Sequence, residues 1–127
     1  MQEGNMYKCE VCGNIVSVLV VGGGTLTCCD QEMTLMEEKS TQKEGEEKHV
    51  PVVEINGNTV NVKVGSVNHP MEENHYISLI QLLKDGFVVA GKRLVPGDDP
   101  VAEFELTDVN GVSARILCNI HGVWVSN

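Results

Sequence analysis

The chain has 127 residues, about the length of one domain, so it is too short for two full-sized hydrophobic cores, although a small metal-stapled module could accompany one core. Its 9 Lys and Arg residues and 18 Asp and Glu residues give a net charge of −9. Because nucleic acids and anionic membrane surfaces both attract a basic face, this balance argues against binding to either of them.

No segment of the sequence predicts membrane insertion or export. The longest nearly apolar run, residues 15–21, already contains Ser17 and is far shorter than the ~20 apolar residues of a membrane-spanning helix. The first residues lack the basic and apolar regions of a signal peptide. We therefore expect a cytoplasmic protein.

The chain has five cysteines, an odd number that cannot all pair in disulfides. Because no export signal is predicted, we expect reduced thiols, which favours metal or redox chemistry over a disulfide framework. Cys9 and Cys12 have the C-x2-C spacing that lets one tight turn direct two thiolates at one metal, and Cys28 and Cys29 follow. Four thiolates close a tetrahedral site that accepts zinc or iron. A structural zinc knuckle, or buried thiols with a vicinal disulfide, are the alternatives.

The segment between the two cysteine pairs predicts a small antiparallel unit. Residues 15–21 are rich in β-forming side chains, three glycines at 22–24 predict a turn, and residues 25–27 return the chain to the metal. Because so short a module buries little apolar surface, we expect the metal to supply most of its folding free energy.

A composition change marks the boundary between two modules. Residues 37–47 contain no apolar side chain, which is typical of a solvated linker. The predicted organisation is an N-terminal metal-stapled module at 1–37, a linker at 38–48 and a second module at 49–127.

The second module has a β pattern throughout. Residues 50–55, an Asn56-Gly57 turn and the alternating residues 59–64 predict a hairpin. Further strands are predicted at 76–83, 87–94, 101–106, 112–118 and 123–126, although the leucines and isoleucine of 76–83 could equally line a helix. Short strands separated by frequent turn signals are typical of an immunoglobulin-like antiparallel β-sandwich, so the predicted fold class is mainly β.

All four histidines lie in the second module, beside predicted turns: His49, His69, His75 and His121. A fifth cysteine, Cys118, has no partner for a disulfide and precedes His121 at C-x2-H spacing. Imidazole and thiolate groups are ligands of transition metals, so a second metal site is a candidate. Periodicity alone does not show that these residues converge.

Three motifs and their flanks resemble the superoxide reductase family. They are Glu-Lys-His-Val-Pro at 47–51, Asn-His-Pro-Met with His-Tyr-Ile at 68–77, and Cys-Asn-x-His-Gly-x-Trp at 118–124. The N-terminal cysteine pairs resemble the desulforedoxin-type domain. The whole chain therefore resembles the two-iron desulfoferrodoxins over essentially its full length.

This resemblance implies two iron ions per chain. In the sandwich, His49, His69, His75 and His121 would be equatorial ligands, Cys118 the axial ligand, and the sixth position open to solvent. Cys9, Cys12, Cys28 and Cys29 would hold an FeS4 centre, which favours iron over zinc there. Glu47 matches the family's glutamate that can occupy the sixth position after oxidation, and Lys48 matches its basic residue beside that position.

The activity implied by the resemblance is the one-electron reduction of superoxide to hydrogen peroxide, with re-reduction by an external, rubredoxin-like donor, in a homodimer. Two alternatives stay open. The chain could be a non-catalytic iron electron-transfer or metal-binding protein, or a zinc-stapled β-sandwich interaction module. Without the motif, Glu47 and Lys48 would be read as ordinary solvated charges, and Trp124 as packing.

Overall fold

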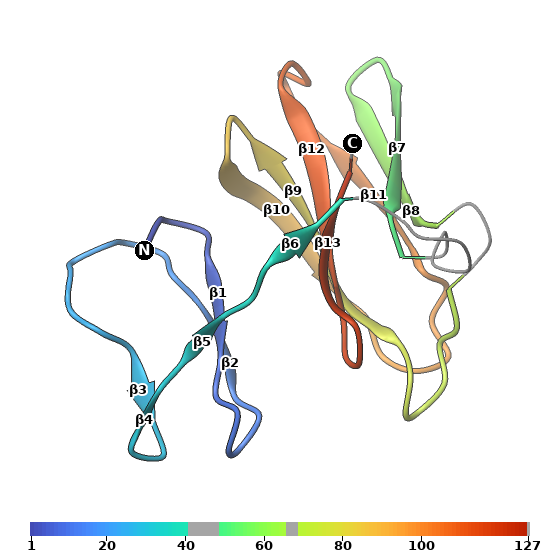
Figure 1. Ribbon diagram of the computed structural model, residues 1–127. Coiled ribbons are helices and arrows are strands. Elements are labelled where there is room, and N and C mark those ends of the chain that lie inside the picture. Colours follow the sequence, from blue (N-terminus) through green and yellow to red (C-terminus); the bar gives the residue numbers. More distant parts are fainter. Residues whose placement is uncertain (41–48, 66–68, 127) are drawn as a thin grey trace. The chain divides into compact units, whose positions relative to one another are not determined.

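The computed structural model describes residues 1–40, 49–65 and 69–126. These residues form β-strands and turns without a helix, and they divide into two compact units, Met1–Glu37 and Glu38–Asn127 (Figure 1). The predicted mainly β fold is confirmed. No helix capable of crossing a membrane exists in this described part of the chain.

The N-terminal unit contains a three-stranded antiparallel sheet and a two-stranded ribbon. In the sheet, β1 is the central strand, between β2 and β5; the ribbon pairs β3 with β4. The strands are β1 (Met6–Lys8), β2 (Ile15–Ser17), β3 (Thr27–Cys28), β4 (Gln31–Glu32) and β5 (Thr34–Leu35).

The predicted pairing of residues 15–21 with residues 25–27 is wrong. Strand β2 ends at Ser17 and pairs with β1, because the short turn that carries Cys9 and Cys12 joins these two strands directly. Strand β3 pairs with β4 across a two-residue turn, Cys29 and Asp30, whose φ angles of 54° and 60° are those of a type I′ hairpin. The glycines at 22–24 lie in an irregular connection, since they offer no side chains to pack.

The second unit is a sandwich of a five-stranded and a three-stranded sheet (Figure 1). The sheet orders are β10-β9-β12-β13-β6 and β11-β8-β7, and every pairing is antiparallel except that of β13 with β6. The strands are β6 (Glu38–Lys39), β7 (Pro51–Asn56), β8 (Thr59–Val64), β9 (Ile77–Lys84), β10 (Phe87–Arg93), β11 (Val101–Glu105), β12 (Val112–Cys118) and β13 (Gly122–Val125).

The segment that could have been a helix is the strand β9. It pairs with β10 on one side and β12 on the other, so both of its edges are satisfied by the five-stranded sheet. Its apolar character follows from burial in the core, because Ile77, Ile80 and Leu82 are 0 % exposed and belong to the core cluster.

The core lies between the two sheets, and it reaches the end of the unit where the histidines lie. Strand β8 contributes Val60, Val62 and Val64, which alternate with more exposed residues and are at most 1 % exposed. Full burial of such a side chain stabilises the fold by roughly 1.5–3 kcal/mol. Cys118 and Trp124 belong to the same cluster, so the packing that forms the sandwich also fixes two residues of the candidate site.

The first residues of the predicted linker belong to the sandwich. Glu38 and Lys39 form β6, which pairs in parallel with Val123 and Trp124. Glu38 also accepts a hydrogen bond from the buried guanidinium of Arg115 at 3.4 Å. The remaining linker residues from 41 to 48 lie outside the described residues.

Candidate metal centres

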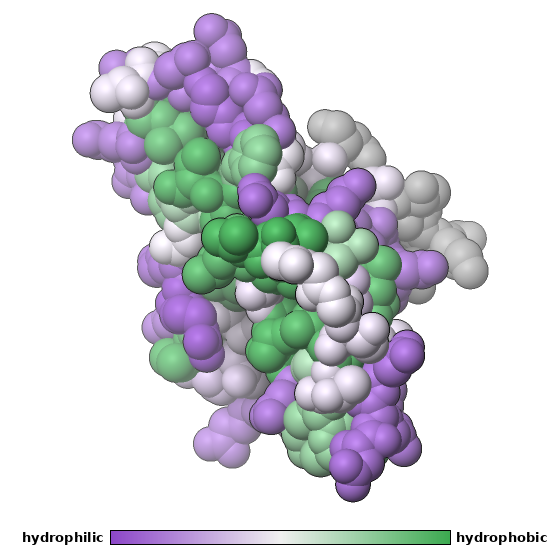
Figure 2. All heavy atoms as spheres, turned by 90° about the vertical axis from the view of Figure 1, so that its left-hand side faces the viewer, coloured by the Kyte–Doolittle hydropathy of each residue, from purple (hydrophilic) through white to green (hydrophobic). Residues whose placement is uncertain are grey.

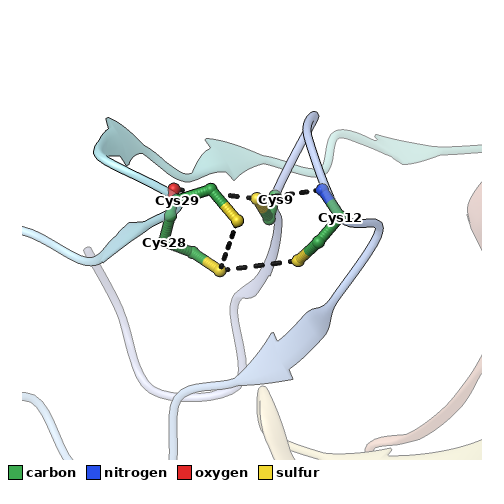
Figure 3. A group of neighbouring side chains, drawn as sticks. All are labelled: Cys9, Cys12, Cys28 and Cys29. Carbon is green, nitrogen blue, oxygen red and sulfur yellow. Dashed lines mark hydrogen bonds between the residues drawn. The ribbon is translucent and has the colours of Figure 1, made fainter.

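The four N-terminal cysteines lie together on two tight turns (Figure 3). Cys9 and Cys12 come from the turn between β1 and β2, and Cys28 and Cys29 from the β3–β4 hairpin. Their sulfurs all lie within 4.8 Å of one another, and the Sγ atom of Cys28 is 3.6 Å from that of Cys12 and 3.9 Å from that of Cys29. We call this group the cysteine centre.

The geometry of the cysteine centre fits a tetrahedral metal ion. Metal–sulfur bonds of about 2.3 Å at tetrahedral angles separate the sulfurs by about 3.8 Å, which matches the two Cys28 distances. All five cysteines of the chain are free thiols, so the vicinal disulfide considered for Cys28 and Cys29 does not form. Cys29 lies in the turn of the hairpin, which requires its positive φ of 54°. At this position its sulfur lies close to those of the other three cysteines.

Local hydrogen bonds give these thiols different pKa values. The backbone N–H of Cys12 donates to the Cys9 sulfur at 3.4 Å, which lowers the pKa of Cys9 to about 6. The neighbouring Cys12 side chain raises the pKa of Cys28 to about 12 and also raises the pKa of Cys29. Four crowded thiolates repel one another, so a bound cation is what allows all of them to ionise.

A second group of ligand atoms lies at one end of the sandwich: His49, His69, His75, Cys118 and His121, which we call the histidine–cysteine centre. The ligand atoms of four of them, all but His69, lie within 4.8 Å of one another. His69 joins the group through its Nε2 atom, 3.6 Å from the Cys118 sulfur. The structure thus brings together all five residues that the motifs indicated.

Strand ends position four of these five residues. Cys118 ends β12, where the pairing with β9 shifts register, and His121 lies in the turn that leads into β13. His49 lies just before β7 and His75 just before β9. The loops at this end of the sandwich therefore carry the ligands, while the sheets behind them are held by the core.

The distances in the histidine–cysteine centre fit a single metal ion. Two nitrogens bonded to one metal at about 2.1 Å and at right angles lie about 3.0 Å apart. Nε2 of His49 and Nδ1 of His121 are 3.0 Å apart, and the Cys118 sulfur is 3.7 Å from the same Nδ1. Four imidazoles with one thiolate form a donor set suited to iron.

The centre is buried on one side and open on the other. His49, His69 and Cys118 are at most 3 % exposed, whereas His121 is an exposed residue. Among the described residues, the histidine–cysteine centre is therefore open to solvent at the side of His121.

Groups around the ligands fix their orientation. Nδ1 of His69 lies 2.7 Å from the carbonyl oxygen of Pro70, a contact that leaves Nε2 as the metal-binding nitrogen. The side chain of Asn119 accepts a hydrogen bond from the N–H of Tyr76 at 2.8 Å and donates one to the Asn74 carbonyl at 3.1 Å. Asn119 therefore ties the Cys118 turn to the His75 loop, a role that the sequence analysis missed although Asn119 lies inside the motif.

Trp124 packs in the core as predicted, and it also contacts two of the five ligands. Its ring stacks on His49, and its Nε1–H donates to the His121 carbonyl oxygen at 3.2 Å. Glu47 and Lys48, the two residues predicted to act beside the centre, lie outside the described residues.

Family models and curated relatives match the chain along its length. The model described as desulfoferrodoxin matches residues 41–127, and the model for the desulfoferrodoxin N-terminal domain matches residues 1–36. A desulfoferrodoxin homolog of Archaeoglobus fulgidus is 60% identical over 95% of this chain and 94% of the relative. The desulfoferrodoxin of Nitratidesulfovibrio vulgaris is 53% identical over 94% of this chain and 92% of the relative.

Solved structures with a similar fold include proteins named superoxide reductases. The superoxide reductase of Treponema pallidum has a TM-score of 0.77 at 30% identity and covers 97% of both chains. A one-iron superoxide reductase of Giardia intestinalis has a TM-score of 0.57 at 34% identity and covers 62% of this chain and 94% of its own.

Proposed function

The chain belongs to the desulfoferrodoxin family, and from this membership and its two ligand clusters we propose that it is a superoxide reductase with two iron ions. The observation that carries the proposal is the convergence of four imidazoles and one thiolate at a centre with one exposed side. His49, His69, His75, Cys118 and His121 would hold the reacting iron. Cys9, Cys12, Cys28 and Cys29 would hold the second.

The proposed reaction consumes one electron and two protons for each superoxide and yields hydrogen peroxide. A ferrous ion held by His49, His69, His75, Cys118 and His121 would supply the electron. Four neutral imidazoles and one thiolate contribute a charge of −1, so the centre with a divalent ion is locally positive in a chain of net charge −9. The exposed side at His121 admits the small anion and solvent protons.

Two residues directly before His49 are proposed to act on the substrate side. Lys48 would attract the anion and donate a hydrogen bond to it, and Glu47 would occupy the sixth ligand position after oxidation. Their positions in the Glu-Lys-His-Val-Pro motif support these roles. A Lys48→Ile variant would slow the encounter and weaken its dependence on salt.

The N-terminal centre is proposed to support electron supply or structure rather than the superoxide reaction itself. The predicted boundary after residue 37 is supported by the two compact units, the second of which begins at Glu38, the first residue of the predicted linker. Because the two ligand sets lie on separate units, loss of the cysteine centre should leave the reaction largely intact.

Partners of the chain are proposed from chemistry and family likeness. The electron donor would be a small rubredoxin-like protein, and the free thiols fit a reducing cytoplasm. A homodimer is supported by exposed apolar side chains of the N-terminal unit, and Figure 2 shows hydrophobic residues gathered on the face drawn there. The exposed apolar side chains of the N-terminal unit include Ile15, Val16, Leu19, Val20, Val21 and Leu35.

Rapid mixing of the reduced, iron-loaded chain with superoxide tests the proposed function. The expected result is a fast reaction that yields one hydrogen peroxide per histidine–cysteine centre. Absence of a fast reaction, with both centres loaded with iron, would falsify the assignment. A non-catalytic electron carrier would instead show a single sulfur-ligated iron chromophore and histidines without metal.

A further inference from the structure

Lys39 lies beside the histidine–cysteine centre, although the sequence placed it in a charged linker. It is the second residue of β6, and the parallel pairing of β6 with β13 sets it opposite Trp124. This pairing brings a lysine of the predicted linker to the turn that carries His121.

Two contacts connect the Lys39 ammonium to residues of the centre. Its Nζ atom donates a hydrogen bond to the carbonyl oxygen of His121 at 3.0 Å, and it lies 5.1 Å from the centroid of the Trp124 ring. The indole Nε1–H of Trp124 donates to the same carbonyl oxygen at 3.2 Å. One backbone carbonyl of a proposed ligand is thus held by two donors, and one of them carries a full positive charge.

The charge of Lys39 is not cancelled by a carboxylate in the described part of the chain. The two ion pairs found there join Lys84 with Asp108 and Arg115 with Glu38. The Lys39 ammonium instead meets a carbonyl oxygen and the face of an aromatic ring, both of which leave its unit charge in place. Its field therefore acts on the neighbouring centre.

We propose that Lys39 is a positioning residue that also tunes the histidine–cysteine centre, an inference that rests on the proposed function. By holding the His121 carbonyl, Lys39 fixes the turn between Cys118 and β13. Its positive charge disfavours the added positive charge of the oxidised centre, and so it raises the reduction potential. Because the Lys39 side chain is exposed, salt should screen the electrostatic part of this effect.

Lysine variants with a matched control separate this role from a general change in charge. Lys39→Met and Lys92→Met change the net charge equally, but Lys92 lies on β10, at the opposite edge of the same sheet from β6. The measurement is the midpoint potential of the histidine–cysteine centre, by redox titration of the iron-loaded full chain at low and high salt. Circular dichroism checks that each variant is folded.

The expected result at low salt is a three- to tenfold shift of the redox equilibrium toward the oxidised centre in Lys39→Met, or about 30–60 mV for one electron. This shift should shrink at high salt, and Lys39→Arg should retain the original potential. Lys92→Met should leave the potential unchanged.

Two outcomes would overturn the role of Lys39. One is a Lys39→Met potential equal to that of Lys92→Met at low salt. The other is a shift that persists at high salt and also occurs in Lys39→Arg, because a purely structural contact would produce it. The potential is measured without superoxide, so a chain that fails to react with superoxide can still show the Lys39 shift.

Discussion

The ring of Trp124 stacks on the imidazole of His49, with the two centroids 4.8 Å apart and the planes inclined by 17°. Trp124 is 3 % exposed and belongs to the core cluster, so the same side chain joins the sandwich interior to a proposed iron ligand. It is also the single tryptophan of the chain, which makes its fluorescence a reporter of this centre.

Replacement of Trp124 should weaken both the fold and the metal site. Trp124→Phe keeps an aromatic ring on His49 but loses the N–H donor to His121, so we expect a loss of about 1 kcal/mol of unfolding free energy. Trp124→Leu also loses the stack and leaves a cavity, with an expected loss of roughly 2–4 kcal/mol. Urea denaturation of the metal-free chain measures these losses.

Iron affinity gives a second measure of Trp124. Since residues that orient metal ligands typically contribute 10–100-fold to affinity, Trp124→Leu should bind iron at the histidine–cysteine centre about tenfold more weakly. An affinity for iron unchanged in Trp124→Leu would show that the stack on His49 does not orient this ligand.

Arg115 provides a test of the buried polar contacts in the sandwich. Its guanidinium is almost fully buried and donates to Oε1 of Gln81 from Nε at 2.9 Å and from Nη2 at 2.6 Å. Burial lowers the pKa of Arg115, an effect that Glu38 partly offsets. Lysine cannot reproduce this planar pair of donors, so Arg115→Lys should cost about 2 kcal/mol of unfolding free energy.

Glu38→Gln is the matched control for Arg115. Glu38 is partly exposed and lies 3.4 Å from the Arg115 nitrogen, so its charge should contribute less than about 1 kcal/mol. Equal losses in Arg115→Lys and Glu38→Gln would show that the ion pair, rather than the Gln81 contacts, stabilises this region.

Metal removal should affect the two units differently. The buried hydrophobic side chains of the N-terminal unit are only Met6, Cys9 and Val18, whereas the sandwich has an extensive core. Chelation should therefore unfold residues 1–37 and leave β9 and β12 protected, because metal binding supplies the missing folding free energy. Hydrogen exchange with mass spectrometry measures this, and retained protection across residues 1–37 would contradict it.

At low pH the protein should lose a small stabilising contribution from the surface residue Asp108. The Lys84 side chain, 2.5 Å away, lowers the pKa of Asp108 below its ordinary value of 3.8. A lowered folded pKa stabilises the chain above the unfolded value, and this contribution is lost as the pH falls through the folded value. Asp108→Asn should therefore be less stable than the original chain at pH 7, and the difference should shrink as the pH falls below 3.8 and through the lowered folded pKa. A difference that is independent of pH would contradict the electrostatic origin.

The strands of the sandwich could be predicted because their signals are local. Val60, Val62 and Val64 alternate with polar residues, and this period of two identified β8 with its observed bounds. The preceding turn lies at residues 57–58, one position later than predicted, and uses the φ of +62° that Gly57 adopts readily. Local patterns thus defined where strands lie.

Pairings between distant segments could not be read from local patterns. The two-residue strand β6 carries no periodicity, so Lys39 resembled the solvated charges that follow it. The strand pairing in the N-terminal unit was predicted wrongly, because β-forming residues alone do not determine which strand they pair with. The convergence of His49 and Cys118 likewise came from the motifs and their resemblance, since such long-range contacts depend on how the sheets pack.

X-ray absorption at the iron edge tests the central claim most directly, using the reduced full chain with Cys9→Ser and Cys12→Ser to remove the cysteine centre. The five-residue site predicts iron surrounded by nitrogen ligands and one sulfur, and the sulfur signal should disappear when Cys118→Ser is added. An iron environment without sulfur, or one that Cys118→Ser leaves unchanged, would contradict the proposed histidine–cysteine centre.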